Sequence, residues 1–327
     1  MRRISVGLLA TALITSACGG GGSSTFGGTE PVSDSFGIDS SNGVAAARQS
    51  YDAVIASGGI ADIGGAAGLS SAPSDGSAIA RQATTPEVLI LDVVSLIPFG
   101  PEVEPCLGGT GTVALSGDIA VPGTLTSGDV FRIEYDLCDE GQGEVIDGNI
   151  DLTVRDFSGD FFLGTYLLSM DAIIDTLSVA TATDTLIADG DATITLDTLE
   201  APYVETGVSG SSVTQSSNAG TESLTSYSSR QTLDGNQEPA EYTMDASGTL
   251  DSSQLPGSVT YSTEAIFRGF VPAYPREGAL LVQAGNSSAR LVVLDDANIR
   301  IEIDSNGDGS ADDVIDLTWQ EFLDSGP

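Results

Sequence analysis

The sequence predicts a mainly β fold. We expect a large antiparallel meander sheet, either curved and barrel-like or folded as a sandwich, after one or two N-terminal helices. The first observation is alternation. Within residues 130–137, the charged residues Arg132, Glu134 and Asp136 alternate with Phe131, Ile133, Tyr135 and Leu137, as in a strand with one buried face. The second is the recurrence of Asp-Gly turn signals, at Asp147-Gly148, Asp189-Gly190, Asp234-Gly235 and Asp308-Gly309. Strands with one solvent-exposed face usually pair antiparallel, which favours a meander.

The candidate strands follow Cys106. The clearest are residues 130–137 and 149–155, and the second of these places Ile150, Leu152 and Val154 on one face. The others are residues 161–170, 173–180, 192–198, 222–232, 240–246, 257–267, 279–284, 289–294, 298–304 and 314–320. Residues 203–238 are dominated by Ser, Thr, Asn and Gly, so we expect exposed edge strands or a long mobile loop there.

Two helices are predicted before the strands. In residues 44–55 the helical period places on one face Val44, Ala47, Tyr51, Val54 and Ile55, and Ser41 or Asn42 can cap the start. Thr85-Pro86-Glu87 is typical of a helix start, and residues 88–97 are apolar nearly all round. This second run must be buried, as a central helix or a strand. We favour a helix around which the sheet wraps.

The first residues predict that the chain is targeted to a membrane. Arg2 and Arg3 precede a short apolar run, which is the pattern of a signal peptide and is too short to span a bilayer. The segment Ile14-Thr15-Ser16-Ala17-Cys18 resembles the lipobox of bacterial lipoproteins, with Thr15 where leucine is usual. The resemblance implies cleavage before Cys18 and several acyl chains on it, which hold a protein firmly. The alternative is an ordinary cleaved signal with an incidental cysteine.

Three regions follow from these patterns. Residues 1–17 are the signal peptide, residues 18–84 are a lipid anchor and a Gly/Ser-rich tether with a short helix, and residues 85–327 are the β-rich domain. In bacteria that sort lipoproteins, aspartate after the acylated cysteine signals retention in the inner membrane. Here that residue is Gly19, so the resemblance implies an outer-membrane protein, facing either the periplasm or the cell surface.

Composition excludes several functions. The 47 acidic residues outnumber the 11 basic ones, all of which are Arg, and the net charge of −36 repels nucleic acid and anionic headgroups alike. Without His there is no Ser-His-Asp or Cys-His catalytic set, and without Lys there is no Schiff base or P-loop lysine. Hydrolysis by paired carboxylates stays open. No pair stands out among so many acids, so we predict no catalytic residues.

Two cysteines remain if Cys18 is acylated. In an oxidising compartment, Cys106 and Cys138 favour a disulfide. It would close a loop of about thirty residues and stabilise the fold by about 3–4 kcal/mol in the chain-entropy model. The alternative is two buried free thiols.

One loop contains residues of the types that bind metal ions. Between two alternating segments, oxygen side chains fall at the spacing of the first part of an EF-hand, with glycine at position six. The candidate Ca²⁺ ligands are Asp304, Asn306, Asp308, the Ser310 carbonyl and Asp312. Position twelve, a glutamate in EF-hands, is Ile315, and the flanking segments read as strands. The alternative is a hairpin turn built from the usual turn formers. A bound ion would stabilise the hairpin rather than take part in catalysis.

Residues 106–323 resemble a group of uncharacterised proteobacterial lipoproteins. The similarity rests on the Cys pair, Leu280 to Gly285, the Asp-rich loop and Thr318-Trp319. It implies a β-rich envelope lipoprotein and no activity. We therefore predict a lipid-anchored envelope domain with a binding or structural role. The alternatives are a carrier of a lipid or other apolar ligand and a carboxylate-based hydrolase. The protein partner or apolar ligand is not identified, and we expect Trp319 to be a core residue.

Overall fold

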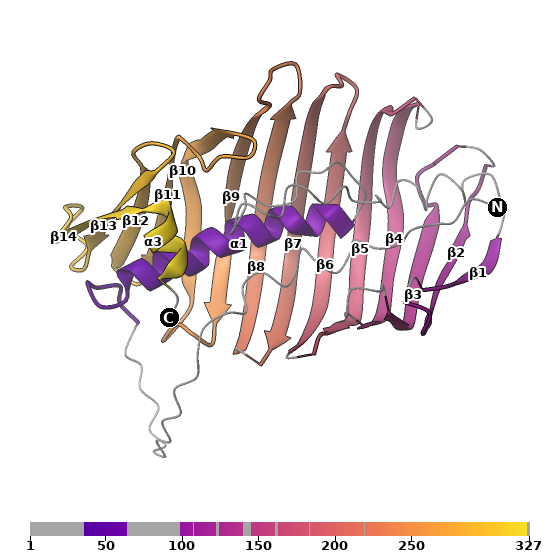
Figure 1. Cartoon of the computed structure of the whole chain (residues 1–327), viewed down its shortest axis with the longest axis horizontal. Coiled ribbons are helices and arrows are strands. Elements are labelled where there is room, and N and C mark those ends of the chain that lie inside the picture. Colours follow the sequence, from indigo (N-terminus) through magenta and orange to yellow (C-terminus); the bar gives the residue numbers. More distant parts are fainter. Residues whose placement is uncertain are drawn as a thin grey trace, which may run out of the picture.

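The computed structural model describes residues 36–63, 99–106, 108–121, 124–139, 145–160, 163–182, 184–218 and 220–325. They form one antiparallel sheet of fourteen strands, whose order in space is the order of the sequence (Figure 1). This confirms the mainly β meander. The sheet is open rather than closed into a barrel, and its two edge strands are the first and the last.

The bounds of the elements are as follows. The strands are β1 (Phe99–Pro105), β2 (Thr112–Asp118), β3 (Val130–Asp139), β4 (Val145–Asp160), β5 (Thr165–Ala180), β6 (Thr185–Asp197), β7 (Tyr203–Ser217), β8 (Gly220–Asp234), β9 (Glu241–Ser252), β10 (Val259–Phe270), β11 (Glu277–Ala284), β12 (Ser287–Val293), β13 (Asn298–Asp304) and β14 (Asp313–Thr318). The helices are α1 (Gly43–Ile63) and α3 (Trp319–Asp324).

The Ser/Thr-rich region is the middle of the sheet. β7 and β8 are paired along their whole length, so the prediction of edge strands or a mobile loop at 203–238 was wrong. Their inner face buries Val208, Leu224 and Tyr227. On the outer face, hydroxyl side chains of neighbouring strands bond to one another: the two oxygens are 3.2 Å apart for Thr214 and Ser223. Neighbouring strands on both sides thus stabilise residues whose own pattern is weak.

Other strand predictions need smaller corrections. The predicted strands 161–170 and 173–180 belong to one strand, β5, and β1 and β2 were not predicted at all. β1 contains Pro101 and Pro105, which lack the N–H that a central strand must donate. A proline-containing strand is compatible with a sheet only at an edge, and β1 is an edge strand.

Two of the four Asp-Gly pairs lie inside strands instead of in turns. Asp147-Gly148 is in β4 and Asp189-Gly190 is in β6, whereas the other two pairs lie at strand ends or in connections as predicted. The Asp147 carboxylate accepts the N–H of Leu137 at 3.2 Å, and Asp189 accepts the N–H of Thr176 at 2.7 Å. Leu137 and Thr176 have φ of +47° and +51°, so each aspartate holds a bulge in the preceding strand.

These bulges form a line across the sheet, which we call the crease. It consists of Leu137, Asp147-Gly148, Thr176, Asp189-Gly190 and Ser226, the last with φ of +49°. The register of every strand pair from β3–β4 to β6–β7, and of β8–β9, shifts there. Because a bulge bends its strand and increases its twist, the crease is expected to bend the sheet between β3 and β9.

α1 lies across the inner face of the sheet (Figure 1), where its most extensive contacts are with β6 to β13 and α3. No residue from Gly43 to Ser57 is exposed. A Cβ on Gly43 would come within 2.6 Å of the Ile303 Cδ1 atom, so the helix begins in close contact with β13. The predicted helix at 44–55 is confirmed, but it belongs to the folded domain rather than to a tether. The predicted helix at 85–97 lies outside the described residues.

The chain ends in a short helix rather than in the predicted strand to residue 320. Thr318 Oγ1 accepts the N–H of Glu321 at 3.1 Å, and the Glu321 carboxylate accepts the N–H of Thr318 at 2.8 Å. This capping box turns the strand into α3. It places Trp319 and Phe322 beside Tyr51 of α1, with ring centroids 5.2 and 6.0 Å from the Tyr51 ring. Trp319 is 1% exposed, which confirms it as a core residue.

Candidate functional site

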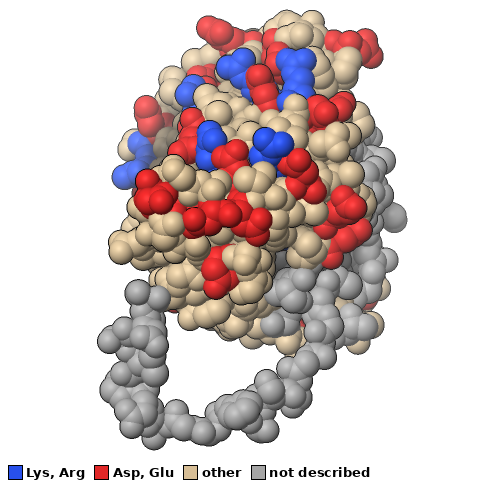
Figure 2. All heavy atoms as spheres, turned by 90° about the vertical axis from the view of Figure 1, so that its left-hand side faces the viewer, with Lys and Arg blue, Asp and Glu red and all other residues tan. Residues whose placement is uncertain are grey.

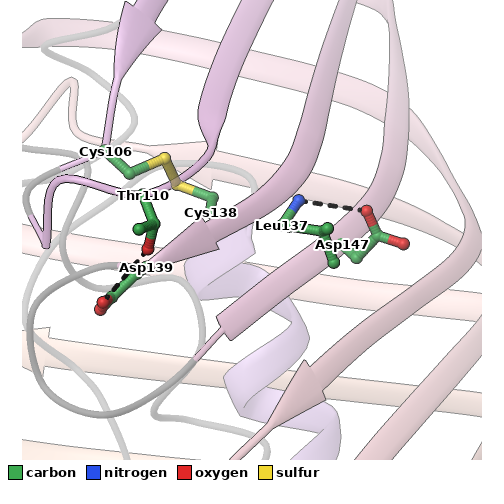
Figure 3. The surroundings of a disulfide bond; sticks show 6 residues. All are labelled: Cys106, Thr110, Leu137, Cys138, Asp139 and Asp147. Atoms are coloured by element: carbon green, nitrogen blue, oxygen red, sulfur yellow. Dashed lines mark hydrogen bonds between the residues drawn. A yellow bond between two sulfur atoms is a disulfide. The ribbon is translucent and has the colours of Figure 1, made fainter.

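Cys106 and Cys138 form a disulfide (Figure 3), with their Cα atoms 5.5 Å apart. Both residues are buried. Cys106 follows β1 and Cys138 lies in β3, so the bond ties the β1–β2 hairpin to the rest of the sheet. The predicted disulfide is confirmed. Its position at one edge, beside the crease residue Leu137, indicates a structural role.

The five candidate calcium ligands lie at the end of β13, which Asp304 occupies, and in the connection from β13 to β14. The Asp304 carboxylate accepts the N–H groups of Gly307 and Gly309, at 2.7 and 2.8 Å. Both glycines have positive φ, which fits a tight turn. Asp308 Oδ1 accepts the N–H of Ser310 at 2.8 Å. The carboxylates of this loop are therefore directed at its own backbone donors.

Asp312 closes the loop. Its carboxylate accepts the hydroxyl and the N–H of Ser305, at 2.6 and 2.9 Å, and the side-chain amide of Asn306 at 2.9 Å. The hydrogen bonds from Ser305 lower the pKa of Asp312. Among the residues that the structure describes, no three Cys, Asp or Glu side chains are arranged to hold a metal ion. Asp304, Asp308 and Asp312 thus each accept hydrogen bonds from donors within the loop.

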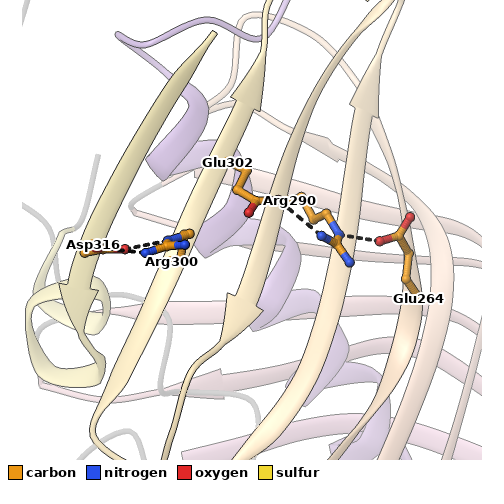
Figure 4. Close-up of polar contacts among 5 residues, drawn as sticks. All are labelled: Glu264, Arg290, Arg300, Glu302 and Asp316. Carbon is orange, nitrogen blue, oxygen red and sulfur yellow. Dashed lines mark hydrogen bonds and ion pairs between the residues drawn. The ribbon is translucent and has the colours of Figure 1, made fainter. Parts of the chain in front are cut away.

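The outer face of the sheet carries a ladder of ion pairs toward its C-terminal edge (Figure 4). Arg290 of β12 lies between Glu264 of β10, at 2.6 Å, and Glu302 of β13, at 3.2 Å. Arg300 of β13 pairs with Asp316 of β14 at 2.7 Å. These hydrogen bonds raise the pKa of both arginines and lower that of Asp316.

Every arginine among the described residues pairs with a carboxylate. Seen from the C-terminal edge strands, arginines lie interspersed among more numerous acidic residues (Figure 2). The excess negative charge therefore stays on the surface, and this face offers no basic patch to a phosphate backbone.

The centre of the outer face has a different character. One row across β6 to β10 consists only of hydroxyl side chains, in the order Thr193, Ser209, Ser228, Ser247 and Ser262. The Ser228 and Ser247 oxygens lie 3.1 Å apart. The row was not predicted, because residues 203–238 were expected to form exposed edge strands or a long mobile loop. Its signal is the abundance of Ser and Thr between residues 209 and 228.

Buried polar groups lie between α1 and the sheet. Arg48 of α1 forms an ion pair with Asp52, and Gln49 Nε2 donates to Gln254 Oε1 at 3.0 Å. Burial lowers the pKa of Arg48 and raises that of Glu222 in β8, while the nearby Arg48 acts in the opposite direction on Glu222. The arrangement links helix to sheet. It was not predicted, because residues 48–52 were assigned to a tether.

Cys18, the predicted lipidation site, lies outside the described residues. None of the helices in the described part is long and apolar enough to cross a membrane. In comparisons with known proteins, the chain matched no family model, no curated protein and no solved structure, so its function must be argued from its own residues.

Proposed function

We propose that this chain is a lipid-anchored protein of the bacterial outer membrane, whose sheet has a binding or structural role. The observation that carries the proposal is the segment Ile14–Cys18, which follows Arg2, Arg3 and a short apolar run. The excess of acidic surface supports anchoring by acyl chains rather than by headgroup contact.

The start of the described chain supports an attachment at one end of the sheet. Ile38 is buried, and its N–H donates to Ser287 Oγ at 2.5 Å, at the beginning of β12. Residues preceding α1 therefore join the domain beside β12 and α3 (Figure 1). An anchor at Cys18 would hold the domain from that end and leave β1 to β5 farthest from it.

We expect replacement of Cys18 by serine to release the protein from membranes, because acyl chains have no other attachment point. Cell fractionation and labelling with an alkynyl fatty acid measure this directly. The matched control removes the other two cysteines, Cys106→Ser with Cys138→Ser, and should stay labelled. A Gly19→Asp variant should move from the outer to the inner membrane. If Cys18→Ser still carries the label and sediments with membranes, the chain is not a lipoprotein.

Calcium at the Asp-rich loop is the less favoured part of the proposal. Because the loop carboxylates already accept N–H donors, we expect neither calcium nor a chelator to change the melting temperature. Asp312→Ala should lower it, since three donors lose their acceptor, and Asp308→Ala should lower it less. A calcium-dependent rise in melting temperature that Asp312→Ala abolishes would instead establish the ion.

A further inference from the structure

The two edges of the sheet differ in what they offer to another strand. The first edge, β1, contains Pro101 and Pro105, which have no N–H to donate to an added strand. The last edge, β14, reads Asp-Val-Ile-Asp-Leu-Thr, without proline and with several residues that favour strands. It lies at the opposite end of the sheet from β1 (Figure 1). β14 is therefore the edge better suited to pairing with a further strand.

The pairing of β14 with β13 shows which of its backbone groups face outward. The N–H of Trp319, directly after β14, donates to the carbonyl oxygen of Ala297 at 3.0 Å, in the register of the two strands. Because backbone groups of successive strand residues point to alternate sides, the odd-numbered residues of β14 point theirs at β13 and the even-numbered residues point theirs away from the sheet. The outward-facing residues are Val314, Asp316 and Thr318.

Two of these three N–H groups have acceptors within the chain. Val314 N–H donates to Asp313 Oδ1 at 2.9 Å, and Thr318 N–H donates to Glu321 Oε2 at 2.8 Å. In the described part of the chain, the N–H of Asp316 and the carbonyl groups of Val314 and Asp316 have no partner. The Glu321 side chain belongs to the capping box of α3, so an added strand would end before Thr318.

The side chains of β14 are covered less well than those of the strand beside it. Ile315 and Leu317 lie on the inner face against the core but are only half-buried, and Val314 on the outer face is 49% exposed. The inner-face isoleucines of β13, which has a strand on each side, are fully buried. A further strand with apolar residues on its inner face would give Ile315 and Leu317 the same cover.

Charge selects the kind of strand that fits this edge. Residues 295–325 contain ten acidic residues and a single basic one, Arg300, which pairs with Asp316 at 2.7 Å. The same imbalance is visible when the molecule is viewed from this end (Figure 2). A second copy of the chain would bring two such edges together and be repelled. A strand with basic side chains on its outer face would be attracted.

We infer that β14 is a docking edge, to which an extended segment of a protein partner adds as a further antiparallel or parallel strand. The partner segment alternates apolar and basic residues. Its apolar side chains cover Ile315 and Leu317, its basic side chains lie beside Asp316, and its backbone pairs with the outward groups of Val314 and Asp316. The inference rests on the binding role proposed above and not on the anchor at Cys18.

A synthetic peptide tests the docking edge in the full-length protein, purified in detergent. The probe is a blocked peptide of about seven alternating Lys and Val residues, which is the length of a short strand. One control carries N-methyl groups on the Val residues and a second carries them on the Lys residues, so that either edge of the peptide loses its donors while its charge is unchanged. A third control alternates Glu and Val. Fluorescence anisotropy of labelled peptides measures binding, and hydrogen–deuterium exchange resolved to single residues measures protection of the Asp316 N–H.

We expect the Lys-Val peptide to bind and to slow exchange of the Asp316 N–H at least tenfold, and one of the two N-methylated peptides and the Glu-Val peptide to do neither. Asp316→Pro removes the outward N–H, whereas Asp316→Ala removes the same carboxylate and keeps the N–H. The proline variant should therefore bind the Lys-Val peptide about tenfold more weakly than the alanine variant.

The exchange measurement on the unmodified protein decides the outcome even if Asp316→Pro does not fold. Equal binding of all the Lys-containing peptides, or binding without protection of Asp316, would reduce the effect to a general attraction between opposite charges and overturn the inference. Protection of Asp316 without any peptide, in a protein that sediments as a dimer, would make a second copy the occupant and also overturn it. None of these results bears on Cys18, whose labelling tests the anchor separately.

Discussion

Replacing Gly148 by alanine is expected to lower the free energy of unfolding by about 2–5 kcal/mol, because a positive φ and a backbone clash act together. Gly148 has φ of +119°, and a Cβ there would lie 2.5 Å from the carbonyl oxygen of Thr176 and 2.8 Å from the Cα atom of Leu177. Both atoms belong to the backbone of β5, which cannot move without breaking its pairing with β4. Urea denaturation of the purified domain measures the loss.

Gly164 is the matched control for this substitution. Its φ is also positive, +68°, but nothing lies within 4 Å of the place where a Cβ would be built. Gly164→Ala should therefore lower the free energy of unfolding only by the cost of placing alanine at a positive φ, about 1 kcal/mol. Equal losses in the two variants would show that β4 and β5 are not in close contact at the crease.

The crease also shows where reasoning from the sequence fails. Asp147-Gly148 and Asp189-Gly190 have the composition of a hairpin turn, and the sequence predicts turns there. Their hydrogen-bond donors, Leu137 and Thr176, come from the preceding strand. Whether an Asp-Gly pair bonds within its own turn or across a sheet depends on a register that no local pattern contains.

In the rest of the molecule too, features marked by a local pattern were predicted, and features that depend on neighbouring strands were not. Alternation predicted strands such as β3, β13 and β14, where large apolar residues mark the inner face, buried in β3 and β13 and half-buried in β14. It failed for β7, whose outer face is rich in small hydroxyl residues and whose stability comes from both neighbouring strands. The Cys106–Cys138 bond was predictable because the chain has few cysteines, whereas the α1 contacts depend on tertiary packing.

Replacing Tyr51 by alanine is the second change expected to have a large effect, about 3–5 kcal/mol, because it removes a buried aromatic ring. The Tyr51 ring is 3% exposed and lies within 5.7 Å of Phe267 in β10, in addition to Trp319 and Phe322 of α3. It is thus the point at which α1, the sheet and the C-terminal helix meet. Trp319 is the single tryptophan, so its fluorescence reports on this junction directly.

Tyr51→Phe distinguishes the contribution of the ring to stability from that of the hydroxyl group. The Tyr51 oxygen is buried and has no hydrogen-bond partner among the described residues, and burial raises its pKa well above the usual value. Removing a buried hydroxyl that makes no hydrogen bond should leave stability unchanged or improve it slightly. The alanine variant should therefore shift Trp319 emission to the red and unfold at lower denaturant, and the phenylalanine variant should do neither. If Tyr51→Phe is as damaging as Tyr51→Ala, the hydroxyl is bonded to a group outside the described residues, and α1 is held by that bond rather than by aromatic packing.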